Sequence, residues 1–259
     1  MTYSMTQVAP TVAEVLQIRP PADGQQEPIA EIVEGLEGAE RLAILAPDAL
    51  GVGQLDRFAE AMPFLQGCCK RRCVTLRSVM PSVTPVNFAT MISGCDLEGH
   101  GIRSKEMDFR CETLFDVLEE MGEQAAGCGR PTYTGGQLLA RCAQIDGTAA
   151  VSDDAGVEEI VLRIAREETP RFIIAQIGGT DDHFHRFGIS SEQVLPKLRE
   201  MDNRLQQMCG DLGEIGYAVI ILADHGQHDS GDPEKMGTHG TDSDEDCLVP
   251  CTWLRAAEA

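Results

Sequence analysis

The sequence predicts an α/β fold with three layers, in which helices cover both faces of a largely parallel central sheet. Short apolar runs suited to buried strands alternate with amphipathic segments along the whole chain. Turn residues such as Gly, Pro and Asp bound these runs, and no internal repeat or linker divides the sequence. A length of 259 residues is enough for one large domain of this kind.

Each element follows from its pattern of apolar residues. The predicted strands are 41–46, 73–79, 125–127, 149–152, 171–177, 217–223 and 247–253. The predicted helices are 8–18, 29–36, 55–66, 85–93, 113–121, 136–144, 157–168 and 191–212. The predicted loops include 95–102, the segment around Asp181 and the acidic stretch 227–245. The acidic residues Asp242, Asp244, Glu245 and Asp246 are expected to form a solvated run of charge. We therefore expect a peripheral N-terminal helical segment over residues 1–40 and a single domain over residues 41–259.

The charge limits the kinds of partner. With 21 basic and 42 acidic residues, the net charge is −21, which argues against a nucleic-acid polymer or an anionic membrane surface as the main partner. A small phosphorylated substrate stays compatible, because bound divalent cations can invert the local field. We expect no signal peptide or membrane span, and the ten scattered cysteines contain no CxxC pair. These features predict a cytoplasmic protein with mostly reduced cysteines, and they leave its oligomeric state open.

Thr84 lies where a predicted strand, a Pro-Ser turn and a predicted helix meet. Pro85 suits the first turn of a helix because its missing N–H costs nothing there, which predicts Thr84 as the N-cap residue. A group at this place faces unpaired N–H groups and the positive end of the helix. That environment favours a bound phosphate or a developing alkoxide, although an ordinary N-cap threonine would have the same local sequence.

Polar residues follow the predicted strands at several junctions. Because parallel strands end along one edge of a sheet, these side chains could converge there. They are Asp48, Thr84, Asp181 with His185, and Asp224 with His225, and His239 lies in the loop after the last pair.

Three carboxylates and three imidazoles suit two divalent metal ions about 4 Å apart. Zinc is the expected ion, and Mn²⁺ or Fe²⁺ is also compatible with Asp and His ligands. One ion would lower the pKa of the Thr84 hydroxyl, which is otherwise too weak an acid to attack phosphorus at neutral pH, and the other would activate water. The sequence therefore predicts a metal-dependent nucleophilic threonine.

The motifs, taken in order, resemble those of the alkaline phosphatase superfamily, and most closely its nucleotide pyrophosphatase/phosphodiesterase branch. The resemblance covers most of the chain from about residue 41 onward and implies an alkaline-phosphatase-like fold. The matching segments are Ala46-Pro47-Asp48, Pro81 to Asn87, Gly94, Gly99 to Ile102, Asp181-x-x-x-His185-Arg186-Phe187-Gly188, Ala223 to Gly226 and Gly237 to Gly240.

The resemblance also implies roles for single residues. One metal ion would be held by Asp181, His185 and His239. The second would be held by Asp48, Asp224 and His225, with Thr84 between the two ions as nucleophile. Attack by Thr84 on phosphorus would give a phospho-threonine intermediate, and water would then hydrolyse it from the opposite side.

The sequence departs from this family pattern at two positions. Pro85 removes the backbone N–H that usually follows the nucleophile. Lys105 stands where the phosphodiesterase branch has an asparagine that binds a phosphate oxygen, and its positive charge would favour a more highly charged phosphoryl group. Two assignments remain open here. Either Lys105 contacts the transferred group, or Lys105 is solvated and Asn87 or a backbone N–H binds the oxygen.

The resulting prediction is a metal-dependent hydrolase of phosphate esters, acting on a nucleotide or another small phosphate ester. A phosphomonoesterase or phosphonate hydrolase on the same scaffold is one alternative, which Lys105 would suit. A phosphoryl-transferring mutase is a second alternative, and a metal-binding module of low activity is a third.

Overall fold

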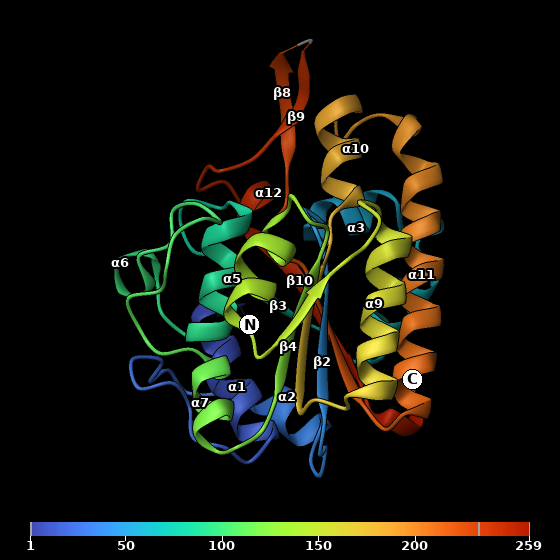
Figure 1. The fold of residues 1–259 in the computed structure, drawn as a ribbon. Coiled ribbons are helices and arrows are strands. Elements are labelled where there is room, and N and C mark those ends of the chain that lie inside the picture. The colour runs from blue at the N-terminus through green and yellow to red at the C-terminus, as the bar shows by residue number, and fades with distance from the viewer. Residues whose placement is uncertain (1, 233, 259) are drawn as a thin grey trace.

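In the computed structural model, which describes residues 2–232 and 234–258, an eight-stranded sheet forms the centre of the fold (Figure 1). The strand order is β1-β3-β10-β7-β2-β6-β4-β5, and β10 is antiparallel to both of its neighbours whereas the other pairs are parallel. The strands are β1 (Thr2–Ser4), β2 (Leu42–Pro47), β3 (Val74–Arg77), β4 (Ala125–Gly129), β5 (Ile145–Thr148), β6 (Phe172–Ile177), β7 (Ala218–Leu222) and β10 (Leu248–Leu254). This architecture confirms the predicted three-layer fold with a largely parallel sheet.

Helices cover both faces of the sheet (Figure 1). The layer on one face contains α3 (Val52–Arg57), α4 (Pro63–Arg71), α9 (Asp154–Glu167), α10 (Gly179–Phe187) and α11 (Leu195–Glu214). The opposite layer contains α1 (Val8–Val15), α2 (Ala30–Gly35), α5 (Thr84–Ser93), α7 (Leu114–Glu120), a π-helical turn (Gly135–Leu139) and α8 (Ala140–Cys142). The short helices α6 (Leu97–His100) and α12 (Asp244–Cys247) lie in loops, as do the 3₁₀ turns Met5–Gln7, Ala59–Ala61, Glu192–Val194 and Ala256–Glu258.

The middle strands explain why the sheet is parallel and fully covered. Every residue of β2, β6 and β7 is buried, as expected for strands with helices on both faces. Ile44 of β2, for example, lies in register with Ile174 of β6 and Ile220 of β7. Continuous apolar runs therefore form the central strands. Because these strands are parallel, their carboxyl ends lie on the same side of the sheet, where the strands end.

The N-terminal segment belongs to the same core. Strand β1 pairs in parallel with β3 at the edge of the sheet, and Met5, Val8 and Val12 are almost fully buried in the main hydrophobic cluster. The predicted boundary at residue 40 does not coincide with a break in this core. The sequence pattern missed β1 because a strand of three residues is too short to show alternation.

Several predicted elements differ from the observed ones. The helix predicted at 55–66 is interrupted, because Pro63 begins a new helix, α4. The strand expected at 149–152 is instead β5, four residues earlier. The predicted acidic loop contains a hairpin of β8 (His228–Asp232) and β9 (Lys235–Thr238), which protrudes beyond α10 (Figure 1).

Within the described residues, none of the helices has both the length and the apolar character needed to cross a membrane.

Gly94 ends α5 in the left-handed region, with φ of 74°, and a Cβ atom there would lie 2.8 Å from the Cα of Gly24. Gly122 has nearly the same φ, 73°, but no atom within 4 Å of such a Cβ. We predict that Gly122→Ala costs about 1 kcal/mol of unfolding free energy, from backbone strain alone. Gly94→Ala should cost at least about 1 kcal/mol more, because the loop at Gly24 must move. Urea denaturation of both variants measures this difference, and equal losses would show that the Gly24 contact is unimportant.

Candidate metal centre and active-site cleft

Two neighbouring strands place the first group of polar residues. Because β2 and β7 are parallel and in register, their carboxyl ends meet at the same point of the sheet edge. Asp48 follows β2, and Asp224 and His225 follow β7. All three residues are at most 1% exposed.

The atoms of this first group lie close together. His225 Nε2 is 3.6 Å from Asp48 Oδ1 and 3.3 Å from Asp224 Oδ2. Those two carboxylate oxygens find no hydrogen-bond donor among the described residues. A buried anionic oxygen without a donor is costly, and a divalent cation would satisfy both oxygens at once. The residues of this group therefore fit a metal ion.

A second group lies beside the first. Asp181, His239 and His225 can bring ligand atoms within 4.8 Å of one another. His239 Nε2 and His185 Nε2 are 3.6 Å and 3.3 Å from Asp181 Oδ1. The segment at Asp181 is helix α10 and not the predicted loop. A spacing of four residues places Asp181 and His185 on one face of that helix, which is why both reach the site.

Backbone carbonyls orient the three imidazoles. His185 Nδ1 lies 2.7 Å from the Gly237 carbonyl, His239 Nδ1 lies 2.9 Å from the Ser82 carbonyl, and His225 Nδ1 lies 2.9 Å from the Gly226 carbonyl. A neutral imidazole that donates from Nδ1 presents the lone pair of Nε2. This is the usual arrangement around a metal-binding histidine.

Burial changes the charge of these groups. It raises the pKa of Asp48, and the nearby charge of Asp224 raises it further. Burial also raises the pKa of Asp181, against the effect of His225 and His185. For His239, burial and then the charge of His225 lower the pKa to about 2, so its imidazole stays neutral and able to bind a cation. Bound cations would remove the repulsion between the carboxylates.

Thr84 lies at the edge of the first group, with Oγ1 3.1 Å from His225 Nε2. It occupies the first position of α5, and Val83 is the N-cap, so the predicted N-cap assignment is wrong by one residue. Pro85 is still within the first turn, where N–H groups lack helical partners. The Thr84 hydroxyl is therefore free of a capping bond and faces the polar groups.

Asn87 has a different position from the one expected of a substrate ligand. Its side chain is 0% exposed; Oδ1 accepts from the Val79 N–H at 2.7 Å, and Nδ2 donates to the Val79 and Val83 carbonyls at 3.2 and 3.3 Å. These bonds use the amide to hold the turn before Thr84. The geometry argues against the predicted contact between Asn87 and substrate.

A cleft of about 680 Å³ opens above Thr84. Lys105 and Arg103 line it from the loop between α6 and α7, and Lys105 Nζ also donates to the Thr132 carbonyl. The cleft lining comprises Asp48, Val83, Thr84, Pro85, Arg103, Ser104, Lys105, Glu106, Thr132, Tyr133, Thr134, Gln176, Asp181 and Asp182. The structure thus brings Lys105 to the same cavity as the proposed nucleophile.

Sequence reasoning missed the groups that support the site. Gln176 Nε2 donates to Asp48 Oδ2, and Gln227 Nε2 donates to Asp181 Oδ1. Asp246, expected in a solvated charge run, is fully buried and accepts from Thr241 and His228. The sequence contains one signal of this support. Gln176 is a polar residue inside an apolar strand, and a buried amide needs a hydrogen-bond partner, which here is Asp48.

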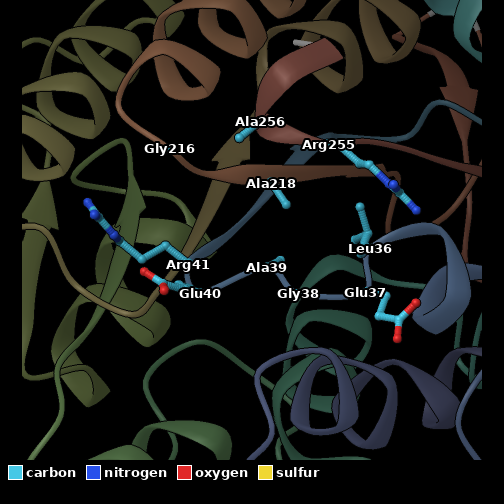
Figure 2. Close-up of a pocket in the computed structure, with 10 residues that line it drawn as sticks. All are labelled: Leu36, Glu37, Gly38, Ala39, Glu40, Arg41, Gly216, Ala218, Arg255 and Ala256. Atoms are coloured by element: carbon cyan, nitrogen blue, oxygen red, sulfur yellow. The ribbon is translucent and has the colours of Figure 1, made fainter.

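A second cavity of about 340 Å³ lies at the other end of the central strands, where β2 and β7 begin. The guanidinium groups of its two arginines point away from the cavity (Figure 2). Arg41 lies over the Tyr217 ring, and Arg255 Nε donates to the Gly35 carbonyl at 2.7 Å. Both cations therefore have structural partners, and the cleft at Thr84 is the better candidate site.

The chain belongs to the type I phosphodiesterase / nucleotide pyrophosphatase family, whose pattern it matches over residues 42–121 and 133–243. This match, together with the fold, confirms the resemblance to the alkaline phosphatase superfamily.

Among curated proteins, the chain is similar to a venom phosphodiesterase of Macrovipera lebetinus, with 23% identity over 221 residues. It is also similar to venom phosphodiesterase 2 of Crotalus adamanteus, with 22% identity over 223 residues. The matches cover 71% and 73% of this chain, but only 25% and 27% of those relatives. The chain thus corresponds to about a quarter of their length.

Two solved structures have a similar fold. Phosphonoacetate hydrolase from Sinorhizobium meliloti 1021, in complex with phosphonoacetate, gives a TM-score of 0.59 at 18% identity and covers 74% of this chain and 57% of its own. Murine ectonucleotide pyrophosphatase/phosphodiesterase 5 gives a TM-score of 0.56 at 14% identity and covers 73% and 58%. At these identities the likeness supports the fold.

We predict that Asp48→Asn stabilises the metal-free protein at neutral pH by on the order of 1–3 kcal/mol, because burial and Asp224 oppose ionisation of the Asp48 carboxyl in the folded state but not in the unfolded chain. The wild type should gain more thermal stability than the variant when Zn²⁺ or Mn²⁺ is added, since it keeps the full ligand set. Thermal melts with a chelator and with each metal measure both effects. A metal-free variant less stable than the wild type would contradict the repulsion argument.

Proposed function

We propose that this protein is a metal-dependent hydrolase of phosphate esters that works through a phospho-enzyme intermediate on Thr84. Asp181, His185 and His239 would hold one divalent ion, and Asp48, Asp224 and His225 would hold another. Membership of the phosphodiesterase family supports phosphoester hydrolysis. The small phosphorylated substrate is a nucleotide or a related ester.

One observation carries this proposal. The Thr84 hydroxyl lies 3.1 Å from His225 Nε2, at the boundary between the two groups of candidate metal ligands. It also lies on the wall of the open cleft. Thr84 is only partly buried and makes no capping hydrogen bond, so a capping role does not account for its position at this cleft.

The chemistry follows from this position. Thr84 Oγ1 attacks phosphorus in line, the bond to the ester oxygen breaks, and the alcohol leaves. Water then attacks the phosphorus of this intermediate and restores the Thr84 hydroxyl. The product is a phosphate monoester when the substrate is a diester, and inorganic phosphate when it is a monoester. When bound, the two ions would supply positive charge that lowers the pKa of the hydroxyl and of water and stabilises the transferred group. The carbonyls of Gly237, Ser82 and Gly226 keep the imidazoles turned toward the site throughout.

Zinc is the ion we propose, because neutral imidazoles and carboxylates in a compact buried site suit it, and Mn²⁺ or Fe²⁺ are the alternatives. Metal analysis of the purified protein tests this choice. We also propose a reducing compartment such as the cytoplasm, since all ten cysteines are free thiols. The relatives named above are venom proteins, so localisation of the tagged protein in its own cell is the test.

Removing the nucleophile should stop turnover but not metal binding. We predict that Thr84→Ala lowers kcat at least about a thousandfold with bis-p-nitrophenyl phosphate and p-nitrophenyl phosphate. Thr84→Ser should keep measurable activity because it keeps a hydroxyl. Acid quenching of the wild type should trap phosphate on Thr84, detected by mass spectrometry. Wild-type turnover by the alanine variant would sink the proposal.

Lys105 favours a second candidate function, hydrolysis of phosphate monoesters or phosphonates. A monoester or phosphonate carries more negative charge than a diester, and an ammonium group in the cleft would stabilise it. The similar fold of a phosphonoacetate hydrolase is consistent with this alternative. The two functions share Thr84 and the metal ligands and differ in the charge of the preferred substrate.

We predict that Lys105→Ala lowers kcat/KM for the monoester by about 10- to 100-fold, because a charged hydrogen bond is lost. The effect on the diester should be several times smaller. Arg103→Ala is the matched control, since it removes the same charge from the same loop and its guanidinium pairs with Glu98 at 3.2 Å. Equal changes for both substrates, or for both variants, would assign Lys105 a general electrostatic role.

A further inference from the structure

Four charged residues form a mostly buried network beneath one side of the cleft. Their side chains come from four elements that are distant in sequence. We call them the α10 anchor; they are Arg130, Asp154, Asp182 and Lys197. Arg130 and Asp154 are 8% and 2% exposed, and Lys197 is 11% exposed. None of these residues belongs to the ligand groups described above.

The α10 anchor supplies the N-terminal cap that helix α10 lacks. The N-cap of α10 is Gly178, which has no side chain to cap the helix. Asp154, from the start of α9, performs this task from outside, because its Oδ1 accepts from the Gly179 N–H at 3.2 Å. A Cβ at residue 179 would lie 2.2 Å from Asp154 Oδ2 and from Lys197 Cε, so this approach requires a glycine. The carboxylate also complements the positive end of the helix.

Arg130 connects the capping residue Asp154 to Asp182 of α10. Its guanidinium donates to Asp154 at 2.6 Å and to Asp182 at 2.8 Å. The Tyr133 hydroxyl donates to the other oxygen of Asp182 at 2.6 Å. Both oxygens of Asp182 are therefore held, and Asp182 is the immediate neighbour of Asp181.

The charges of the anchor suit this role. Burial opposes ionisation of Asp154, but Arg130 and Lys197 lower its pKa overall. Lys197 Nζ lies 2.9 Å from Asp154 Oδ2. Two cations face two carboxylates, so the anchor is itself no place for a metal ion. Its groups hold one another and the first turn of α10 in a fixed position.

We infer that Arg130, Asp154 and Asp182 are positioning residues for the metal ion held by Asp181 and His185. They fix the first turn of α10, and thereby the two ligands that this helix contributes. The other proposed ion depends on residues that follow β2 and β7. The first turn of α10 contacts that group through the Thr180 hydroxyl, which donates to the backbone carbonyl of Asp48 and not to a ligand oxygen. This inference rests on the proposed two-metal site and adds the groups that determine the affinity of one half of it.

The test compares two isosteric substitutions in the same helix, α9. Asp154→Asn removes the charge that caps α10. Glu158→Gln is the matched control, because Glu158 of α9 pairs with Arg204 of α11 in another mostly buried ion pair, with side chains 17% and 13% exposed, away from the first turn of α10. Zn²⁺ and Mn²⁺ binding to metal-free protein is measured by calorimetry and by competition with a chromophoric chelator, and circular dichroism verifies folding.

We expect two binding steps in the wild type. Asp154→Asn should weaken one of them by about 10- to 100-fold, as is usual for groups that orient metal ligands, and leave the other within about threefold. Glu158→Gln should lower the melting temperature without changing either step. Asp182→Asn, at a residue with a partly exposed side chain, should weaken the same step and serves if Asp154→Asn does not fold.

Unchanged affinities in Asp154→Asn and Asp182→Asn, or equal losses in Glu158→Gln, would overturn the inference. Weakening of both steps by the same factor would also overturn it, because a general loss of stability would explain that result. Absence of phosphoesterase activity in the wild type would count against the proposed function alone, since the binding steps are measured without substrate.

Discussion

Asp48 and Asp224 repel each other in a place where water cannot separate them, and much of the site depends on that constraint. The parallel pairing of β2 and β7 forces the two carboxylates together, and the apolar runs of these strands keep them buried. Gln176 and the Ala49 N–H each satisfy one oxygen, which leaves Asp48 Oδ1 and Asp224 Oδ2 without donors among the described residues. The sheet thus concentrates negative charge toward Thr84, and a cation is the physical means of balancing it.

The fold could be predicted from sequence where local pattern and tertiary burial agree. Strands such as 171–177 and 217–223 are continuous apolar runs, and only a fully covered sheet accommodates them. The convergence of Asp48, Asp224 and His225 followed from the same rule, since residues after parallel strands share an edge. The order of motifs supplied the rest, including His239, which no local pattern would connect with Asp181.

Other features depend on contacts that a sequence pattern does not contain. The polar segment at Asp181 suggested a loop, yet it forms α10, because Asp154 and Arg130 from distant elements cap and hold its first turn. Asp246 looked like one of several solvated acids, but it is buried with Thr241 and His228 as partners. Asn87 has a side chain that could bind substrate, but it is buried and its amide bonds to the backbone of the turn. In each case tertiary partners decide the role of a polar side chain.

The turn before Thr84 joins two parts of the site that are far apart in sequence. Asn87 holds the turn from within α5, whereas the Ser82 carbonyl of the same turn orients His239, and Ser82 Oγ donates to the Thr241 carbonyl at 2.8 Å. The proposed nucleophile Thr84 and the proposed metal ligand His239 therefore both depend on this short piece of backbone. Substitutions at Asn87 and His239 should consequently be non-additive in a double-mutant cycle, because each disturbs the element through which the other acts. The contributions of Asn87, Ser82 and His239 to the free energy of this arrangement are therefore coupled, and single substitutions do not measure them separately.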